Sequence, residues 1–328
     1  MDKPAHVLLG ADMGKQLIRS CSIWRALEVV GDLPTLLILE VSWLGARRFD
    51  QYRKQTELLK SLLSDRLSRL VKAGLLEKKL YCESPPRYEY LMTEKGQDLY
   101  WVALMMLRCE KLWHEDGKIS VELTHKTCGA KFDPLPACGS CGDEIDPTQV
   151  SWCEGPGLGW MMPLYSRRRR SRGSDAKSSS LMDQSAQIMG DRWASLIMRS
   201  IYTGVNRFDD IRVDTAIATN ILSERLNWLT QMGLIRQEKY LDNPPRFEYR
   251  LRRKGVDYYH ALLMLLRWGD TYYVAPEGPP LVLTHEPCGG DLDAQVVCSH
   301  CREPIDFHDV RYKIIAAESD GAESAEDL

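Results

Sequence analysis

The feature that most constrains this chain is an internal repeat. Residues 47–96 align with residues 206–255 at a constant offset of 159 and without a gap, and 20 of those 50 positions are identical. Solenoid repeats have periods of about 20–50 residues, so a period near 160 indicates the duplication of a whole domain. The length of 328 residues agrees with about two domains of roughly 150 residues each.

Composition and charge narrow the class of protein. The longest apolar run, Leu36 to Leu44, is interrupted by Glu40, and the N-terminus has no signal-peptide pattern. We therefore expect a cytoplasmic protein, associated with the nucleoid if it binds DNA. The formal net charge of −3 excludes a global positive field, so any affinity for nucleic acid must come from local patches. Ten cysteines in an intracellular chain favour metal or redox chemistry over structural disulfides.

Apolar periodicity and helix-ending residues predict the same order of elements in both copies. In the first copy we expect four helices, two strands joined by a proline-rich turn, and a long apolar helix. The expected elements are helices at 23–30, 33–44, 48–55 and around 63–73, strands at 75–81 and 87–92, and a helix at 94–115. The second copy repeats this order from Gln184 to Tyr273. Helices followed by a two-stranded wing predict a winged helix-turn-helix, a mainly α fold with small β structure (α+β).

Several short motifs recur in known DNA-binding proteins. They are residues 21–27 (CSIWRAL), the apolar second helix, residues 45–49, the Leu-Ser-Asp/Glu-Arg-Leu helix and the Pro-Pro-Arg-aromatic-Glu-Tyr wing. In this combination the chain resembles the HxlR-type winged-helix regulators of bacteria. The resemblance covers about 95 residues in each copy. It implies a dimeric repressor or activator that responds to small reactive or metabolic signals. The chain departs from the family because it carries two such domains instead of one.

The last helix before a wing enters the major groove in this fold, which predicts the residues that contact DNA. For the first head we expect contacts from Lys60, Ser61, Asp65, Arg66, Arg69 and the wing residue Arg87. For the second head we expect contacts from Thr219, Asn220, Glu224, Arg225 and the wing residue Arg246. The alternative is that the leucines of these helices are ordinary core residues and that the arginines between them are merely solvated.

Cysteine and histidine spacing predicts two metal sites. His125-x2-Cys128-x9-Cys138-x2-Cys141 recurs 160 residues later as His285-x2-Cys288-x9-Cys298-x2-Cys301. Each set supplies the four ligands that tetrahedral Zn²⁺ prefers, so we expect two structural Zn²⁺ ions, one in a zinc ribbon after each winged helix. A disulfide, a redox Cys-x-x-Cys pair or a zinc-sensing role is an alternative.

These expectations define a domain plan. It places winged helices at 15–116 and 181–275, zinc ribbons at 117–155 and 276–315, a linker with a basic run (Arg167 to Arg172) at 156–180, and an acidic tail at 316–328. Cys21 lies just before the first helix, where similar regulators carry a reactive cysteine, and is a candidate redox or electrophile sensor. The alternative is that Cys21 is a small apolar residue packed at the domain edge.

The predicted function is a sequence-specific regulator of transcription that binds double-stranded DNA and is not an enzyme, because no catalytic constellation is present. One chain would supply two recognition helices as an intramolecular pseudo-dimer, with homodimerisation as the alternative. A small-molecule or electrophile effector is a further expected partner. The alternative functions are a general transcription factor of winged-helix and zinc-ribbon type, a zinc- or redox-sensing regulator, and an enzyme with accessory ribbons.

Overall fold

The protein is described by a computed structural model that covers residues 17–113, 119–162 and 180–316. The basic run, the acidic tail and the greater part of the predicted linker lie outside these residues. The first head consists of α1 (Ser22–Val30), α2 (Leu33–Trp43), α3 (Phe49–Thr56), α4 (Lys60–Lys72), β2 (Leu76–Cys82), β3 (Arg87–Met92), α5 (Glu94–Gln97) and α6 (Tyr100–Trp113). The second consists of α7 (Asp183–Met189), α8 (Arg192–Tyr202), α9 (Phe208–Thr215), α10 (Thr219–Gln231), β9 (Ile235–Leu241), β10 (Arg246–Leu251) and α11 (Arg253–Tyr272).

The predicted order of elements is confirmed in both heads, with one difference between them. The long helix expected at 94–115 is divided into α5 and α6 by a turn at Asp98 and Leu99, whereas its counterpart α11 is continuous. None of the helices in the described ranges is both long and apolar enough to cross a membrane.

Local sequence explains where the second helix of each head begins. Asp32 precedes α2, and its carboxylate accepts a hydrogen bond from the Thr35 backbone N–H at 3.1 Å. Asp191 caps α8 in the same way, through the Ala194 N–H at 2.9 Å. Such caps satisfy backbone donors that the first helical turn leaves free.

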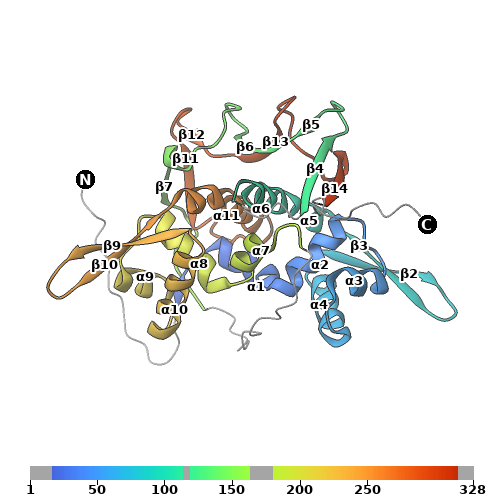
Figure 1. Ribbon diagram of the computed structural model, residues 1–328, viewed down its shortest axis with the longest axis horizontal. Helices are drawn as coiled ribbons and strands as arrows, with labels where there is room; N and C mark the ends of the chain where they lie inside the picture. The colour runs from blue at the N-terminus through green and yellow to red at the C-terminus, as the bar shows by residue number, and fades with distance from the viewer. Residues whose placement is uncertain (1–16, 114–118, 163–179, 317–328) are drawn as a thin grey trace, which may run out of the picture.

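The centre of the molecule is a layer of helices contributed by both repeats. Helices α6 and α11 pack against each other, α1 of the first repeat packs on α11, and α7 of the second packs on α6 (Figure 1). The indole Nε1 of Trp268, a fully buried residue of α11, donates to the Lys95 carbonyl of the first repeat at 3.0 Å. Each repeat therefore buries its first helix against the last helix of the other, so the two heads share one core.

A set of short strands covers the side of the helical layer that lies away from α4 and α10 (Figure 1). The first repeat contributes β4 (Ile119–His125), β5 (Lys131–Phe132), β6 (Pro134–Cys138) and β7 (Val150–Glu154). The second contributes β11 (Leu281–His285), β12 (Gly290–Asp291), β13 (Ala294–Cys298) and β14 (Val310–Ala316). Elsewhere, β1 (Ile18–Arg19) pairs with β8 (Trp160–Met161).

The pairing of these strands corrects the expectation of two self-contained ribbons. Strand β4 pairs with β14, β7 with β11 and β6 with β13, and every one of these pairs joins the two repeats. Among the described strands of this layer, those that pair within one repeat are the two-residue strands β5 and β12, which add to β4 and β11 respectively. Neither of the two predicted ribbon segments forms its sheets alone, because the backbone partners of its longer strands belong to the opposite repeat.

Candidate nucleic-acid interface and metal centres

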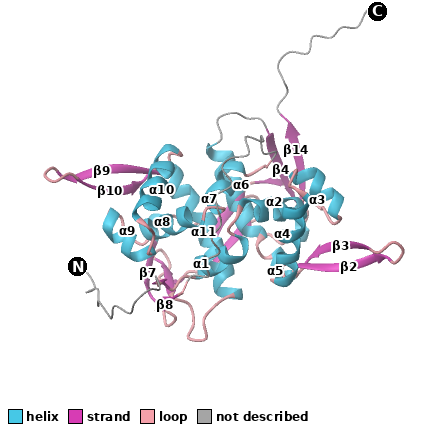
Figure 2. Ribbon diagram, turned by 90° about the horizontal axis from the view of Figure 1, so that it is seen from below, coloured by secondary structure: helices cyan, strands magenta, loops and turns pink. Residues whose placement is uncertain are grey.

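The two helices predicted to read DNA lie on one side of the molecule. Helices α4 and α10 both project away from the strand layer, and the two wings extend outward at opposite ends (Figure 1). The view from that side shows both helices and both wings together (Figure 2). This arrangement offers a single face along which both heads could meet one duplex.

Most of the side chains predicted to contact DNA are exposed on this face. In the first head, exposure is found at Lys60, Ser61, Asp65, Arg69 and Arg87. In the second head, it is found at Thr219, Asn220, Glu224 and Arg246. Contact of these residues with DNA remains a prediction.

Arg66 and Arg225 do not belong to this exposed set. Each is only 8% exposed, and its guanidinium Nε pairs with the aspartate that caps the second helix of its own head. The Arg66–Asp32 distance is 2.9 Å and the Arg225–Asp191 distance is 2.6 Å. In the structure both arginines are buried and hold the recognition helix against the second helix of its own head, α2 or α8, which does not favour the predicted contact with DNA.

The base of each wing contains an arginine that the sequence reasoning missed. Arg48 forms an ion pair with Glu89 at 3.1 Å and lies over the ring of Tyr81, 4.6 Å from its centroid. Arg207 lies over Tyr240 at the same distance in the second head. The sequence does contain a signal for these contacts, because Arg48, Tyr81 and Glu89 are each identical to the aligned residue of the second copy. The contacts attach the start of the third helix of each head to its wing.

The two recognition faces carry different charge. The exposed face of α4 has Lys60, Arg69 and Lys72, with Arg69 paired to Asp65 at 3.1 Å. Helix α10 has no lysine, and its single arginine is the buried Arg225, whose neighbour Glu224 is exposed. The first head therefore offers more positive charge to a duplex than the second.

All eight predicted metal ligands gather into two clusters, but the grouping differs from the prediction. One cluster contains His125 and Cys128 with Cys298 and Cys301, and the other contains Cys138 and Cys141 with His285 and Cys288. The prediction that each repeat holds its own ion is therefore wrong. Each cluster takes one His-x2-Cys pair from one repeat and one Cys-x2-Cys pair from the other, because the exchanged strands bring those pairs together.

The geometry within each cluster fits a tetrahedral ion. The four ligand atoms of a cluster lie within 4.8 Å of one another. His125 Nδ1 is 3.5 Å from Cys128 Sγ and 3.3 Å from Cys301 Sγ, and the Cys128 and Cys298 sulfurs are 3.9 Å apart. Zinc bond lengths of about 2.3 Å to sulfur and 2.0–2.1 Å to nitrogen give tetrahedral edges of about 3.8 and 3.6 Å. In the second cluster His285 Nδ1 is 3.4 Å from Cys141 Sγ and 3.5 Å from Cys288 Sγ.

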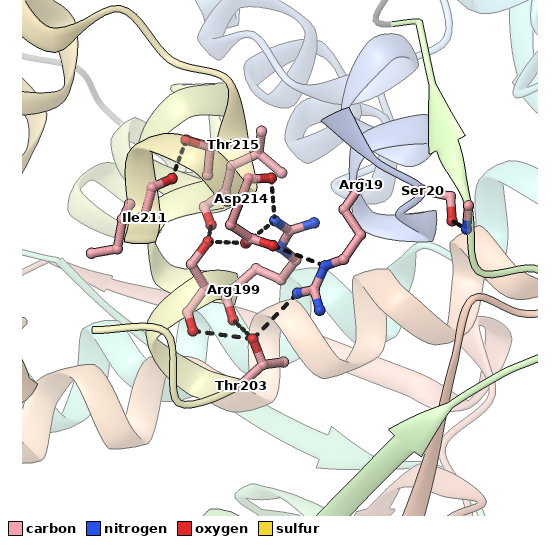
Figure 3. Close-up of polar contacts among 10 residues, drawn as sticks. Arg19, Ser20, Arg199, Thr203, Ile211, Asp214 and Thr215 are labelled. Atoms are coloured by element: carbon pink, nitrogen blue, oxygen red, sulfur yellow. Dashed lines mark hydrogen bonds and ion pairs between the residues drawn. The ribbon is translucent and has the colours of Figure 1, made fainter. Parts of the chain in front are cut away.

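A third polar assembly lies at the start of the first repeat, around Cys21. Asp214, near the end of α9, pairs with Arg199 of α8 and with Arg19 of β1, the latter at 2.9 Å (Figure 3). Cys21 lies beside Arg199 in a pocket that both residues line with Trp152 and Leu266. Burial alone would lower the pKa of Arg199, but the neighbouring Cys21 and Asp214 raise it above its usual value.

The counterpart of this assembly in the other half is different. Glu40 occupies the position of Arg199, and Ser180 occupies that of Cys21. Ser180 donates to the Glu40 carboxylate at 2.6 Å, and the Leu181 N–H donates to it at 2.7 Å. The two halves therefore keep the same contact between repeats but build it from different groups, and only one half has a thiol.

The fold and the two recognition faces define a tandem winged-helix protein of the DNA-binding kind. The sequence profile of the HxlR-like helix-turn-helix family matches residues 29–118 and 188–277, together more than half of the chain. The chain therefore belongs to the HxlR-like helix-turn-helix family, and the double match confirms the tandem duplication.

Individual proteins with known sequence or structure are similar to parts of this chain. An uncharacterized HTH-type transcriptional regulator of Mycobacterium tuberculosis is 40% identical over 124 residues, which cover 38% of this chain and 78% of the relative. An uncharacterized HTH-type transcriptional regulator of Methanothermobacter thermautotrophicus is 36% identical over 85 residues, which cover 26% of this chain and 65% of the relative. A solved structure of a candidate transcription factor from Pseudomonas aeruginosa has 26% identity, covers 44% of this chain and 92% of its own, and has a TM-score of 0.28.

Proposed function

We propose that this DNA-binding transcriptional regulator binds a specific double-stranded site with both heads of one chain, as an intramolecular pseudo-dimer. In regulators of this fold, two recognition helices enter major grooves about one turn, or about 34 Å, apart. A single chain with two heads supplies both helices. The observation that carries the proposal is the common face of α4 and α10, with a wing at each end (Figure 1).

The packing between the heads supports a pair that forms within one chain. The apolar helices α6 and α11 pack on each other, and α1 and α7 cross over to the opposite repeat. In addition, Glu110 of α6 accepts hydrogen bonds from the backbones of Gln184 and Ser185 at 3.1 and 3.2 Å. These contacts support pairing of the two heads within one chain.

Two experiments on selected DNA test this proposal. Sites are selected from a random pool with the full chain, and the complex is then examined by footprinting and mass photometry. We expect one chain per site and a protected region whose two halves differ in sequence, since Lys60, Ser61 and Asp65 align with Thr219, Asn220 and Glu224. Two chains on a symmetric site would contradict the pseudo-dimer, and the absence of any selected sequence would contradict specific recognition.

We further propose that the two Cys/His clusters hold Zn²⁺ and that the ions are structural. Three thiolates and one imidazole per cluster are ligands that Zn²⁺ prefers, and four protein ligands leave no position open for a substrate. Bound zinc would supply tetrahedral cross-linking of the ligand loops. Metal analysis of protein purified without added zinc should give two ions per chain. A content near zero in a protein whose ligand loops remain folded would contradict the proposal.

A further inference from the structure

The two Cys/His clusters are placed so that each joins one repeat to the other. His125 is the last residue of β4 and Cys128 follows that strand, while their partners from the second repeat are Cys298, the last residue of β13, and Cys301 after it. The second cluster has the equivalent arrangement with the repeats exchanged: Cys138 ends β6, His285 ends β11, and Cys141 and Cys288 follow these strands. An ion in either cluster therefore bridges two segments that are 170 or 144 residues apart in the chain, as the Cys128–Cys298 and Cys141–His285 contacts show.

Backbone hydrogen bonds fix this crossed grouping independently of the ligands. The Lys126 N–H donates to the Asp309 carbonyl at 2.7 Å, and the Glu286 N–H donates to the Gln149 carbonyl at 3.0 Å. These two bonds occupy equivalent positions under the 160-residue offset. The crossed arrangement is thus a property of the paired strands, and both clusters obey the same approximate twofold relation.

The clusters are also tied to the helices that carry the heads. Trp101 Nε1 of α6 donates to the Ile305 carbonyl at 2.7 Å, and His260 Nε2 of α11 donates to the Ile145 carbonyl at 2.9 Å. Ile145 and Ile305 each lie four residues after the last cysteine of a ligand pair. Each of the two central helices, α6 and α11, therefore donates a hydrogen bond to a ligand loop of the opposite repeat. The ligand loops are in this way connected to the contact between α6 and α11.

We propose that the two ions form a metal clasp: each is shared between the repeats, and together they hold the two heads at the separation needed to engage DNA with both recognition helices. This inference rests on the proposed two-headed function and on zinc binding. With both ions bound, the second head is held in a fixed position relative to its half-site once the first head has bound DNA. Without the ions, only the helix packing and the short strand pairs between the repeats fix the relative position of the heads, so the gain from binding both half-sites falls.

The crossed grouping is tested with two matched double variants that each remove two cysteines. Cys128→Ser with Cys301→Ser takes both from one crossed cluster, and Cys128→Ser with Cys141→Ser takes both from one repeat. The readout is the number of ions per chain that survives a chelator challenge, with the Co²⁺–thiolate absorption as a second measure. We expect one ion for C128S/C301S and none for C128S/C141S. The reverse result, or equal numbers in the two variants, would overturn the crossed clasp.

The effect on head spacing is tested with DNA that the zinc-loaded protein has selected. Affinity is measured for the full site and for each isolated half-site, before and after zinc removal. We expect zinc removal to weaken binding to the full site by at least about tenfold while half-site affinity stays unchanged, because tethering changes avidity without altering contacts. Unchanged affinity for the full site would overturn the clasp. Failure of the zinc-loaded protein to bind any DNA would instead contradict the proposed function, so the two failures are distinguishable.

Discussion

Arg66 and Asp32 form an ion pair, 2.9 Å between Nε and Oδ1, that fastens the recognition helix α4 to the cap of α2. Arg225 and Asp191 repeat it in the second head at 2.6 Å. The Asp32 carboxylate therefore has two partners, because it also accepts a hydrogen bond from the Thr35 backbone N–H in the first turn of α2. This shared carboxylate sets the position of α4 relative to α2.

Replacing Arg66 should destabilise the fold, because Asp32 would lose the partner that fastens α4 to α2. We expect Arg66→Ala to lower the free energy of unfolding by about 2 kcal/mol, the scale of a hydrogen bond to a charged group. Denaturant unfolding followed by circular dichroism measures this change. Arg69→Ala is the matched control, since Arg69 is exposed and should change stability by less than about 0.5 kcal/mol. Equal stability of the two variants would contradict the structural role of Arg66.

Replacing the wing arginines should weaken binding to DNA of any sequence. Arg87 and Arg246 are exposed at the wings, where contact with phosphate or minor groove contributes to affinity. For each of Arg87→Ala and Arg246→Ala we expect the slope of log affinity against log salt to decrease by about 1, as the loss of one phosphate contact predicts. Lys131→Ala is the control, because β5 lies on the opposite side of the molecule (Figure 1). Unchanged slopes in both wing variants would remove the wings from the interface.

Stability should depend on pH through Asp270, which lies in the contact between the repeats. Ser22 of α1 donates to its carboxylate, while burial raises the pKa of Asp270 from its ordinary 3.8 to about 6. A raised pKa means that the folded state favours the protonated form. The stabilisation is therefore fully present below about pH 4 and is lost as the pH rises through about 6.

Asp270→Asn should remove this pH dependence. Relative to the parent protein, the variant should gain stability between about pH 4 and 7, by at most about 3 kcal/mol, since one pKa unit corresponds to about 1.4 kcal/mol. Denaturant unfolding at a series of pH values measures the difference. Ser22→Ala keeps the carboxyl group and should move the transition to higher pH, because the Ser22 hydrogen bond lowers the pKa of Asp270. A difference that is constant over this range would refute the prediction.

The helices, the wings and the list of metal ligands could be predicted because each depends on local spacing. The burial of Arg66 was predictable as well, since Leu63, Arg66, Leu67 and Leu70 follow the i, i+3, i+4, i+7 pattern of one helix face. An arginine in that series needs a partner for its charge, and Asp32 at the start of α2 supplies one. The position of this helix before the wing favours a DNA contact, whereas the helix face on which Arg66 lies favours burial, and in the structure Arg66 is buried.

The crossed grouping of the metal ligands could not be predicted in the same way. Both repeats carry the same His-x2-Cys and Cys-x2-Cys pairs, so grouping within a repeat and grouping between repeats use the same ligand types. What decides between them is the pairing of β4, β6 and β7 with strands of the other repeat. Short strands with similar sequences in both copies contain no signal for which copy supplies the partner.

We predict that Cys21 reacts with electrophiles, and the residues around it indicate what such a reaction would change. It is only 4% exposed, which favours a packing role, but it precedes α1 and lies beside the guanidinium of Arg199 from the other repeat. Cys21 shares a pocket with Arg199, Trp152 and Leu266, so a small electrophile that enters this pocket would meet its sulfur. A bulky adduct at this buried position would separate α1 from α8 and so disturb the contact between the heads.

We therefore expect a quinone to release the parent protein from its selected DNA site, and Cys21→Ser to abolish most of that response. Cys109→Ala is the matched control: Cys109 is also buried, but burial raises the pKa of its thiol to about 12, so it should stay protonated and unreactive. Fluorescence anisotropy of labelled DNA follows release, and mass spectrometry identifies the modified cysteine. Zinc content is measured in parallel, because quinone attack on the ligand thiolates would also release DNA. If Cys21→Ser responds as the parent does while zinc is retained, Cys21 has only the packing role.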